Sequence, residues 1–273
     1  MVDIKVIFVI MFFILGTCLG SFYNVLGLRV PNKESIIKPR SHCPNCHHEL
    51  SWLELIPIIS YLLLKGKCKN CHEKISVLYP LNELFCGVLF AVSFYSWGFS
   101  LELIVALSIS SLLCMVIASD LTYLVIPDGF IITVGLIVAI VRFIQYGLYD
   151  GLVCLAFGVL SFALMYLIMV FGSKVFHKEA MGGADVKLMF VVGLVTAPIL
   201  SKVTTGELFL NILMPLFVIV IASILALPSS LYLYVKQREN VIPFGPFLVV
   251  GLLIVYFTKV DIKDVFMFLL GRK

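Results

Sequence analysis

The sequence predicts an all-α polytopic membrane protein, and three observations lead to this fold class. Of the 273 residues, 61% are apolar and only 13% are charged, whereas a soluble domain is close to half apolar and one quarter charged. Apolar runs long enough to cross a bilayer as helices recur from one end of the chain to the other. Lys and Arg gather beside the ends of these runs, where they orient a membrane protein. The net charge of +4 therefore does not indicate nucleic-acid binding.

About eight transmembrane helices are expected, with boundaries accurate to a few residues. The run near the N-terminus is longer than the apolar part of a secretory signal and has no small-x-small cleavage site, so we expect it to remain as the first helix. The run at 187–200 is short, and the apolar tail at 265–270 is too short to cross. Either segment can change the number of spans by one. The expected spans are 6–28, 79–97, 101–119, 129–147, 152–172, 187–200, 209–234 and 244–258.

Charge sets the expected orientation. The polar stretch between the first two spans holds eight basic and four acidic residues within 29–78, so the positive-inside rule places it in the cytosol. By alternation, the breaks at 120–128, 173–186 and 235–243 are also cytosolic. If the chain has eight spans, the basic C-terminal tail lies on the outer side of the membrane, which departs from the positive-inside rule. The chain is thus divided into a first transmembrane helix (1–28), a cytosolic loop (29–78) and a membrane-embedded domain (79–273).

The cytosolic loop carries two C-x2-C pairs, Cys43/Cys46 and Cys68/Cys71, separated by 21 residues. This spacing is typical of a four-thiolate zinc site. Two disulfides are disfavoured in a reducing cytosol, and four unrelated cysteines would not be paired in this way. Four thiolates leave no open position for water, so zinc is expected to stabilise the loop and not to catalyse. Neighbouring histidines that could replace a ligand are interpreted as flanking residues: His42, His47, His48 and His72.

Acidic residues beside or within spans are functional candidates because a charge in the bilayer is unfavourable. Asp120 directly follows the run at 101–119, Asp128 follows Pro127, and Asp185 precedes the run at 187–200. Two facing carboxylates that share a proton provide aspartic protease chemistry, in which the ionised partner activates water and the protonated one polarises the scissile carbonyl.

Each of these residues also has an ordinary interpretation. Gly182 and Gly183 allow a close backbone approach at a dyad, but they are equally typical of a turn after which Asp185 caps a helix. Asp128 after proline is typical of a turn or a helix start. Glu83 lies near the start of its span, where it could pair with Lys187, contact substrate, or interact with the helix N-terminus.

Several short motifs follow one another along most of the chain. They are Gly20-Ser-Phe-Tyr-Asn24-Val25, Arg29-Val-Pro31, the two C-x2-C pairs, Ile56-Pro57 with Ser60-Tyr61-Leu62, Tyr79-Pro80 with Glu83, Asp120 with Ile126-Pro127-Asp128, and Gly182-Gly-Ala-Asp185-Val-Lys187. In this order and spacing they resemble the type IV prepilin peptidases, or leader peptidase/N-methyltransferases, including the type that processes competence pseudopilins. Ala184 replaces the second glycine of the family's G-x-G-D signature.

The resemblance implies that Asp120 and Asp185 are the catalytic pair. From their positions in the sequence, Asp128, Lys187, Glu83, Gly182 and Gly183 are candidate supporting residues. It implies cleavage of a short basic leader from prepilins or pseudopilins at the cytosolic face of the bacterial cytoplasmic membrane. Many members also methylate the new N-terminus with S-adenosylmethionine, an activity associated with the cysteine-bearing region. No glycine fingerprint for that cofactor occurs in the sequence, so its binding residues are not located.

Two alternatives remain open on the sequence. One is a peptidase without methyltransferase activity, in which the cysteine loop is structural. The other is a non-enzymatic scaffold or transporter, in which zinc organises a partner-binding loop and the aspartates pass protons or ions. The substrates, the oligomeric state and the arrangement of the spans do not follow from apolar composition.

Overall fold

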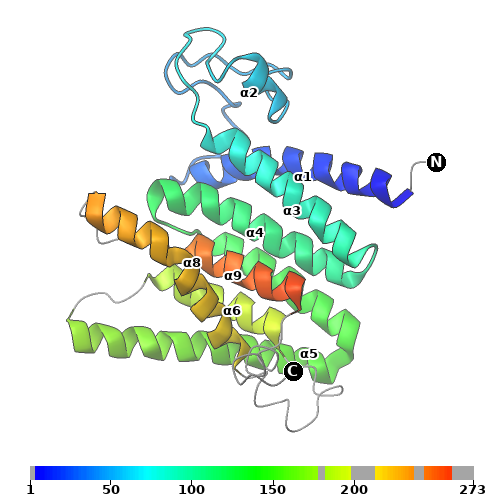
Figure 1. Ribbon diagram of the computed structural model, residues 1–273, viewed down its shortest axis with the longest axis vertical. Coiled ribbons are helices and arrows are strands. Elements are labelled where there is room, and N and C mark those ends of the chain that lie inside the picture. Colours follow the sequence, from blue (N-terminus) through cyan, green and yellow to red (C-terminus); the bar gives the residue numbers. More distant parts are fainter. Residues whose placement is uncertain (1–3, 178–181, 198–212, 237–242, 260–273) are drawn as a thin grey trace. The chain divides into compact units, whose positions relative to one another are not determined.

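Helices make up the regular structure of the computed structural model, which describes residues 4–177, 182–197, 213–236 and 243–259 (Figure 1). In this part of the chain there is no strand, and two isolated β-bridges are the only sheet-like pairs. The predicted all-α class is therefore confirmed for these residues. The helices are α1 (Ile4–Arg29), α2 (Ile59–Leu63), α3 (Leu78–Trp97), α4 (Leu101–Tyr123), α5 (Asp128–Phe176), α6 (Gly183–Thr196), α8 (Met214–Lys236) and α9 (Gly245–Thr258).

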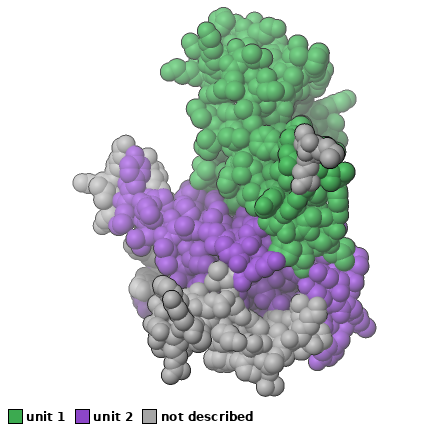
Figure 2. All heavy atoms as spheres, turned by 45° about the vertical axis from the view of Figure 1, so that its right-hand side comes forward, with its two compact units in different colours: residues 1–103, 113–123 green, residues 104–112, 124–273 purple. Residues whose placement is uncertain are grey.

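The chain divides into two compact units, which are coloured separately in Figure 2. Unit 1 consists of residues 1–103 and 113–123, and it contains α1, α2, α3 and both ends of α4. Unit 2 consists of residues 104–112 and 124–273, and it contains α5, α6, α8 and α9.

Five helices in the described residues are long and apolar enough to cross a membrane: α1, α3, α4, α5 and α8. Only 17% of the most apolar stretch of α1 is buried within the protein, and its exposed side chains include Ile7, Ile10, Met11 and Ile14. A continuous apolar surface of this length suits contact with lipid. The chain is therefore a multi-pass membrane protein, as its composition predicts.

Helix α5 is 49 residues long, about 73 Å if it were straight, and it combines two of the predicted spans. Gly147 interrupts it with φ 80° and ψ −177°. A Cβ on Gly135 would lie 3.3 Å from the Phe190 ring and one on Gly158 would lie 3.0 Å from it. Positions 23 residues apart on a straight helix are separated by about 35 Å, so the chain must bend back between them. The expected spans at 129–147 and 152–172 are thus two arms joined at Gly147, and the expected break at 148–151 is helical.

The other predicted spans each coincide with a helix, but their lengths differ. Helices α6 and α9 have 14 residues each, or about 21 Å, which is shorter than the hydrocarbon layer of about 30 Å. The number of crossings therefore stays a prediction. Parts of the expected spans and breaks lie outside the described residues: 198–200, 209–212, 178–181, 237–242 and the tail at 265–270.

Helix α4 is longer than the predicted span at 101–119. It continues to Tyr123, so Asp120 lies inside its last turn and not directly after the helix. Leu124 then has a positive φ of 54°, and Ile126 precedes Pro127, a position that disfavours helical backbone. The left-handed backbone at Leu124, and not the charge of Asp120, therefore marks the end of the helix.

Small residues allow α1 and α3 to pack closely in unit 1. A Cβ on Gly16 would lie 2.7 Å from the Cys86 carbonyl oxygen, and one on Gly20 would lie 2.9 Å from the Glu83 Cα. From α3, a Cβ on Gly87 would lie 2.6 Å from the Thr17 methyl group. Gly16 and Gly20 form the G-x-x-x-G pattern that allows close approach of membrane helices.

Helix α6 is the central helix of unit 2, because it contacts α5, α8 and α9. Nine of its 14 residues are buried, including Asp185 in the first turn and Leu188, Met189 and Leu194 further on. Gly193 fits against the second arm of α5, where an added Cβ would lie 2.6 Å from the Phe157 carbonyl oxygen. The start of α6 is therefore held by packing along the rest of the helix.

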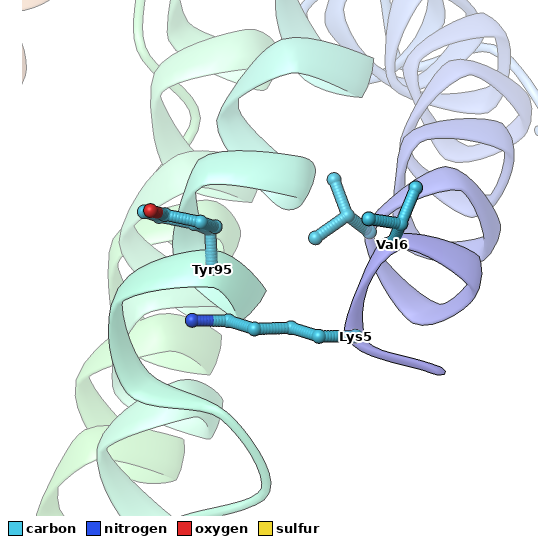
Figure 3. Close-up of a pocket in the computed structure, with 4 residues that line it drawn as sticks. Lys5, Val6 and Tyr95 are labelled. Atoms are coloured by element: carbon cyan, nitrogen blue, oxygen red, sulfur yellow. The ribbon is translucent and has the colours of Figure 1, made fainter. Parts of the chain in front are cut away.

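An open pocket of about 410 Å³ lies at the N-terminal end of α1 (Figure 3). It is lined by Lys5, Val6, Val9 and Tyr95, and the Lys5 ammonium lies 4.1 Å from the centre of the Tyr95 ring. None of these side chains is an acid, a thiol or a metal ligand of the expected site. The pocket is therefore not where we place the candidate chemistry.

Candidate active site and metal centre

The four cysteines of the loop meet in one cluster, as the sequence predicts. Their sulfur atoms all lie within 4.8 Å of one another, and the Cys43–Cys71 and Cys46–Cys68 pairs are each 3.8 Å apart. Sulfurs bound tetrahedrally at about 2.3 Å from a zinc ion lie about 3.8 Å apart, whereas a disulfide bond is about 2.05 Å long. All four are free thiols. The cluster therefore has the geometry of a four-thiolate metal site.

Two matching turns build this cluster. In the first turn, the Cys43 N–H donates to the His48 carbonyl and the Leu50 N–H donates to the Ser41 carbonyl. In the second turn, the Cys68 N–H donates to the Glu73 carbonyl and the Ile75 N–H donates to the Gly66 carbonyl. His47 and His72 both have positive φ, 56° and 58°. Segments 41–50 and 66–75 are thus two copies of one turn. The shared pattern C-x-N-C-H in the sequence is a signal for this repeat that the spacing analysis did not use.

Backbone N–H groups prepare the thiols to bind a cation. A hydrogen bond from the His48 backbone lowers the pKa of Cys46 to about 6, and bonds from the Cys71 and Asn70 backbone lower the pKa of Cys68. The Glu73 backbone also favours the Cys71 thiolate, but desolvation and the neighbouring sulfurs outweigh it and raise its pKa to about 11. Four crowded thiolates repel one another, and a divalent cation removes this repulsion.

The expected flanking role of the histidines fits the structure, because the described residues that gather as metal ligands are the four cysteines. His48 has a different partner, Glu54, at 3.3 Å. The Glu54 carboxylate also accepts hydrogen bonds from the Ser51 hydroxyl and backbone N–H, which lower the pKa of Glu54. Ser51 and Glu54 were missed by the sequence analysis, although S-x-x-E is a known capping pattern.

Asp120 is buried at the end of α4 in unit 1, with 6% of its surface exposed. The same end of unit 1 holds the start of the cysteine loop, because Asn32 donates a hydrogen bond of 2.9 Å to the Tyr123 hydroxyl. A Cβ on Gly27 of α1 would also meet the Cβ of Ala118, near Asp120. Asp120 is thus a buried carboxylate at the end of unit 1 from which the cysteine loop extends.

Asp185 is buried in the first turn of α6 in unit 2, with 8% of its surface exposed. Its backbone N–H donates to the carbonyl of Gly182, the N-cap residue, and a Cβ on Gly182 would lie 3.1 Å from the Asp185 Oδ2. Glycine at 182 therefore leaves room for this carboxylate. A Cβ on Gly183 would have no neighbour within 4 Å, so packing does not require glycine there.

Lys187 and Asp128 join the starts of α6 and α5. The Lys187 ammonium donates to both carboxylate oxygens of Asp128, at 2.6 and 2.8 Å. The two side chains are 47% and 57% exposed, so this ion pair is solvated and weak. Asp128 therefore starts its helix, and it also has a defined basic partner.

Glu83 of α3 is buried and accepts a hydrogen bond of 2.8 Å from the Ile58 backbone N–H. Nearby, the Asn82 amide donates to the Asn24 side chain at 2.8 Å and to the Cys114 carbonyl at 3.2 Å. These bonds tie α1, α3 and α4 together within unit 1. The buried Asn24–Asn82 pair was not predicted, because nothing in the residue pattern links two asparagines 58 positions apart.

Comparison with known proteins identifies two matching family models. The model described as "Bacterial Peptidase A24 N-terminal domain" matches residues 14–97, and the "Type IV leader peptidase family" model matches residues 107–231. The first range contains the cysteine cluster, and the second contains Asp120 and Asp185. No solved structure matches the chain.

Curated relatives agree with these models. A protein of Bacillus subtilis is 36% identical over 246 residues, which cover 89% of this chain and 92% of the relative. A protein of Myxococcus xanthus is 40% identical over 190 residues, which cover 68% of this chain and 56% of the relative. One of Klebsiella pneumoniae is 32% identical over 191 residues, 66% of this chain and 82% of the relative. All three are named prepilin leader peptidase/N-methyltransferase.

A multi-pass helical membrane protein with buried aspartates and these matches is a peptidase of the bacterial membrane. The chain belongs to the type IV leader peptidase family.

Proposed function

We propose that this chain removes the short basic leader from prepilins or pseudopilins, with Asp120 and Asp185 as an aspartic dyad. The observation that carries the proposal is that both carboxylates are buried at helix ends, with 6% and 8% exposure. Burial of an acid without a role is unfavourable. Water activated by one carboxylate attacks the peptide carbonyl, which the other, protonated carboxyl polarises.

The helix ends support a division of these roles. Asp120 lies in the last turn of α4, where backbone carbonyls disfavour a nearby negative charge. Asp185 lies in the first turn of α6, where backbone N–H groups favour one. We therefore propose that Asp185 activates the water and that Asp120 polarises the carbonyl.

Chain topology supports a location of both aspartates on one side of the membrane. The four residues 124–127 between α4 and α5 are too few to cross it, so Asp120 and Asp128 share a side. Lys187 links Asp128 to the start of α6, next to Asp185. The cysteine loop extends from the same end of unit 1 as Asp120, and its excess of basic residues favours the cytosolic side.

We also propose that zinc occupies the cysteine cluster, because four thiolates at this spacing suit Zn²⁺. N-methylation of the new N-terminus by S-adenosylmethionine is proposed from the names of the relatives. Zinc would hold segments 41–50 and 66–75 together and would have no open position for a reactant.

A mass measurement on a co-expressed prepilin tests the proposed cleavage. Asp120→Asn and Asp185→Asn are expected to lower leader removal by at least about 100-fold each. Asp150→Asn is the matched control, because Asp150 is also a buried aspartate, 5% exposed, and it should retain cleavage. Equal cleavage in all variants would refute the dyad. Full-length prepilin with every variant, the parent included, in cells that lack another prepilin peptidase would favour a scaffold or transporter. A further gain of one methyl group in the parent would establish the second activity, and its absence would favour a peptidase alone.

A further inference from the structure

Glu83 connects the membrane helix α3 to the middle of the cysteine loop, which in the structure is the segment 30–77 between α1 and α3. Its carboxylate is buried, with 8% of the residue exposed, and its Oε2 accepts the Ile58 backbone N–H at 2.8 Å. The Ser21 side chain of α1 also hydrogen-bonds to Glu83. A buried carboxylate with backbone and hydroxyl donors holds its partners in a defined geometry.

The backbone that Glu83 binds has a disfavoured conformation. Ile58 has φ 61° and ψ −51°, which is unusual for any side chain and especially for a β-branched one. The Ile59 N–H donates to the Pro57 carbonyl across this residue, which makes a γ-turn of the rare, strained type. Such a turn persists only where surrounding contacts stabilise it, and the bond to Glu83 is such a contact.

Helix α2, which begins directly after this turn, connects it to the second half of the cysteine cluster. The Gly66 N–H donates to the Tyr61 carbonyl at 2.9 Å, and the Tyr61 hydroxyl lies 3.4 Å from the Ile75 carbonyl oxygen. Gly66 has φ 68°, and a Cβ there would lie 2.8 Å from the Tyr61 hydroxyl. Gly66 and Ile75 are the two ends of segment 66–75, which presents Cys68 and Cys71. A continuous set of bonds therefore runs from the cluster through α2 to Glu83.

We infer that Glu83 is a positioning residue that anchors the cysteine loop to α3 by stabilising the strained turn at Ile58. Its carboxylate holds the start of α2, and segment 66–75, which carries Cys68 and Cys71, holds the end of α2. The orientation of the loop on unit 1 thus depends both on the metal and on one glutamate of a membrane helix. This inference concerns loop docking: it rests on the proposed zinc in the cysteine cluster and not on the proposed cleavage or methylation.

Hydrogen exchange of the zinc-loaded full chain in lipid nanodiscs tests the inference. Glu83→Ala should accelerate exchange of the amides of residues 58–64 by roughly 10- to 100-fold, because a hydrogen bond to a charged group is lost. Segment 41–50 should keep its protection, and zinc should remain bound at the parent's stoichiometry. Glu83→Gln, whose amide oxygen is a weaker acceptor, should have a smaller effect. Glu102→Ala, which removes a glutamate from the first turn of α4, is the control and should leave this exchange unchanged.

A second substitution separates stabilisation of the turn from simple packing. Glycine adopts positive φ without steric clash, so Ile58→Gly added to Glu83→Ala should recover at least half of the lost protection of the α2 amides on a logarithmic scale. No recovery would mean that Glu83 acts through packing alone, and the inference would be wrong. It would also be wrong if Glu83→Ala left residues 58–64 unchanged, or if zinc and the protection of 41–50 were lost together. Leader cleavage measured on the same samples reports the proposed function separately.

Discussion

Replacing Gly16 by alanine should separate α1 from α3, and the structure sets the size of the effect. The added Cβ would lie 2.7 Å from the Cys86 carbonyl oxygen and 2.8 Å from both the Gly87 Cα and the Phe90 Cβ. Ordinary contacts are about 3.5–4.0 Å, so the helices must move apart by about 1 Å. None of these three atoms can move by a change of rotamer, because each is part of the backbone or directly attached to it. Overpacking of this kind destabilises by about 1–3 kcal/mol.

Gly129→Ala is the matched control for this clash. Gly129 is also helical, and a Cβ there meets nothing within 4 Å. Both substitutions gain the higher helix propensity of alanine, about 1 kcal/mol at most, so the difference between them isolates the clash. We expect Gly16→Ala to be less stable than Gly129→Ala by about 1–3 kcal/mol, measured by reversible unfolding with SDS in mixed micelles and followed by circular dichroism. If the two variants unfold within about 0.5 kcal/mol of each other, the close approach of α1 and α3 is refuted.

Three further predictions concern the loop and the ion pair. Cys46→Ser should reduce bound zinc well below one ion per chain, measured by metal analysis after dialysis, since a hydroxyl does not replace the thiolate; full retention of zinc would contradict a four-thiolate site. Lys187→Met should destabilise by less than about 1 kcal/mol, because both charges of its pair with Asp128 are half-exposed, and a larger loss in the same SDS titration would mean that the pair is buried in the membrane. The pKa of Glu54 is lowered by hydrogen bonds from Ser51. The stability that Glu54 contributes is therefore fully present above the ordinary glutamate pKa of about 4.3. It is lost as the pH falls through the lower pKa of the folded state. Hydrogen exchange of segment 50–55 should therefore rise in acid for the parent and depend less on pH in Glu54→Gln, whereas equal pH dependence would contradict the prediction.

The helices of this protein could be predicted from sequence because lipid is a uniform apolar solvent. A segment that satisfies its own backbone hydrogen bonds and presents apolar side chains is stable there whatever its neighbours are. The predicted runs at 6–28, 79–97 and 244–258 accordingly lie within two residues of α1, α3 and α9. The predicted end of α4 at residue 119 lies too early, because a single acid does not stop a helix and α4 continues to Tyr123.

The cysteine cluster was also predictable, because two C-x2-C pairs limit the ways in which four thiols can meet. The contacts around it were not. The Glu54–His48 and Glu83–Ile58 bonds join residues whose types are compatible with many partners, and only the folded chain brings them within 3.3 and 2.8 Å. The bend of α5 was predictable only in part. The sequence predicted two spans, the positions of Gly135 and Gly158 against Phe190 show that the chain reverses, and the non-helical backbone of Gly147 is where it does so.

The sequence by itself therefore determined the membrane class, the candidate metal-ligating cysteines and the candidate aspartates, because composition, spacing and residue type act locally. Tertiary structure alone decided that Asp120 and Asp185 are buried, that glycines bring α1 and α3 into contact, and that Glu83 holds a strained turn of the loop. Burial and long-range hydrogen bonds depend on which surfaces of different helices meet. Apolar side chains of similar size do not specify that choice until the helices pack.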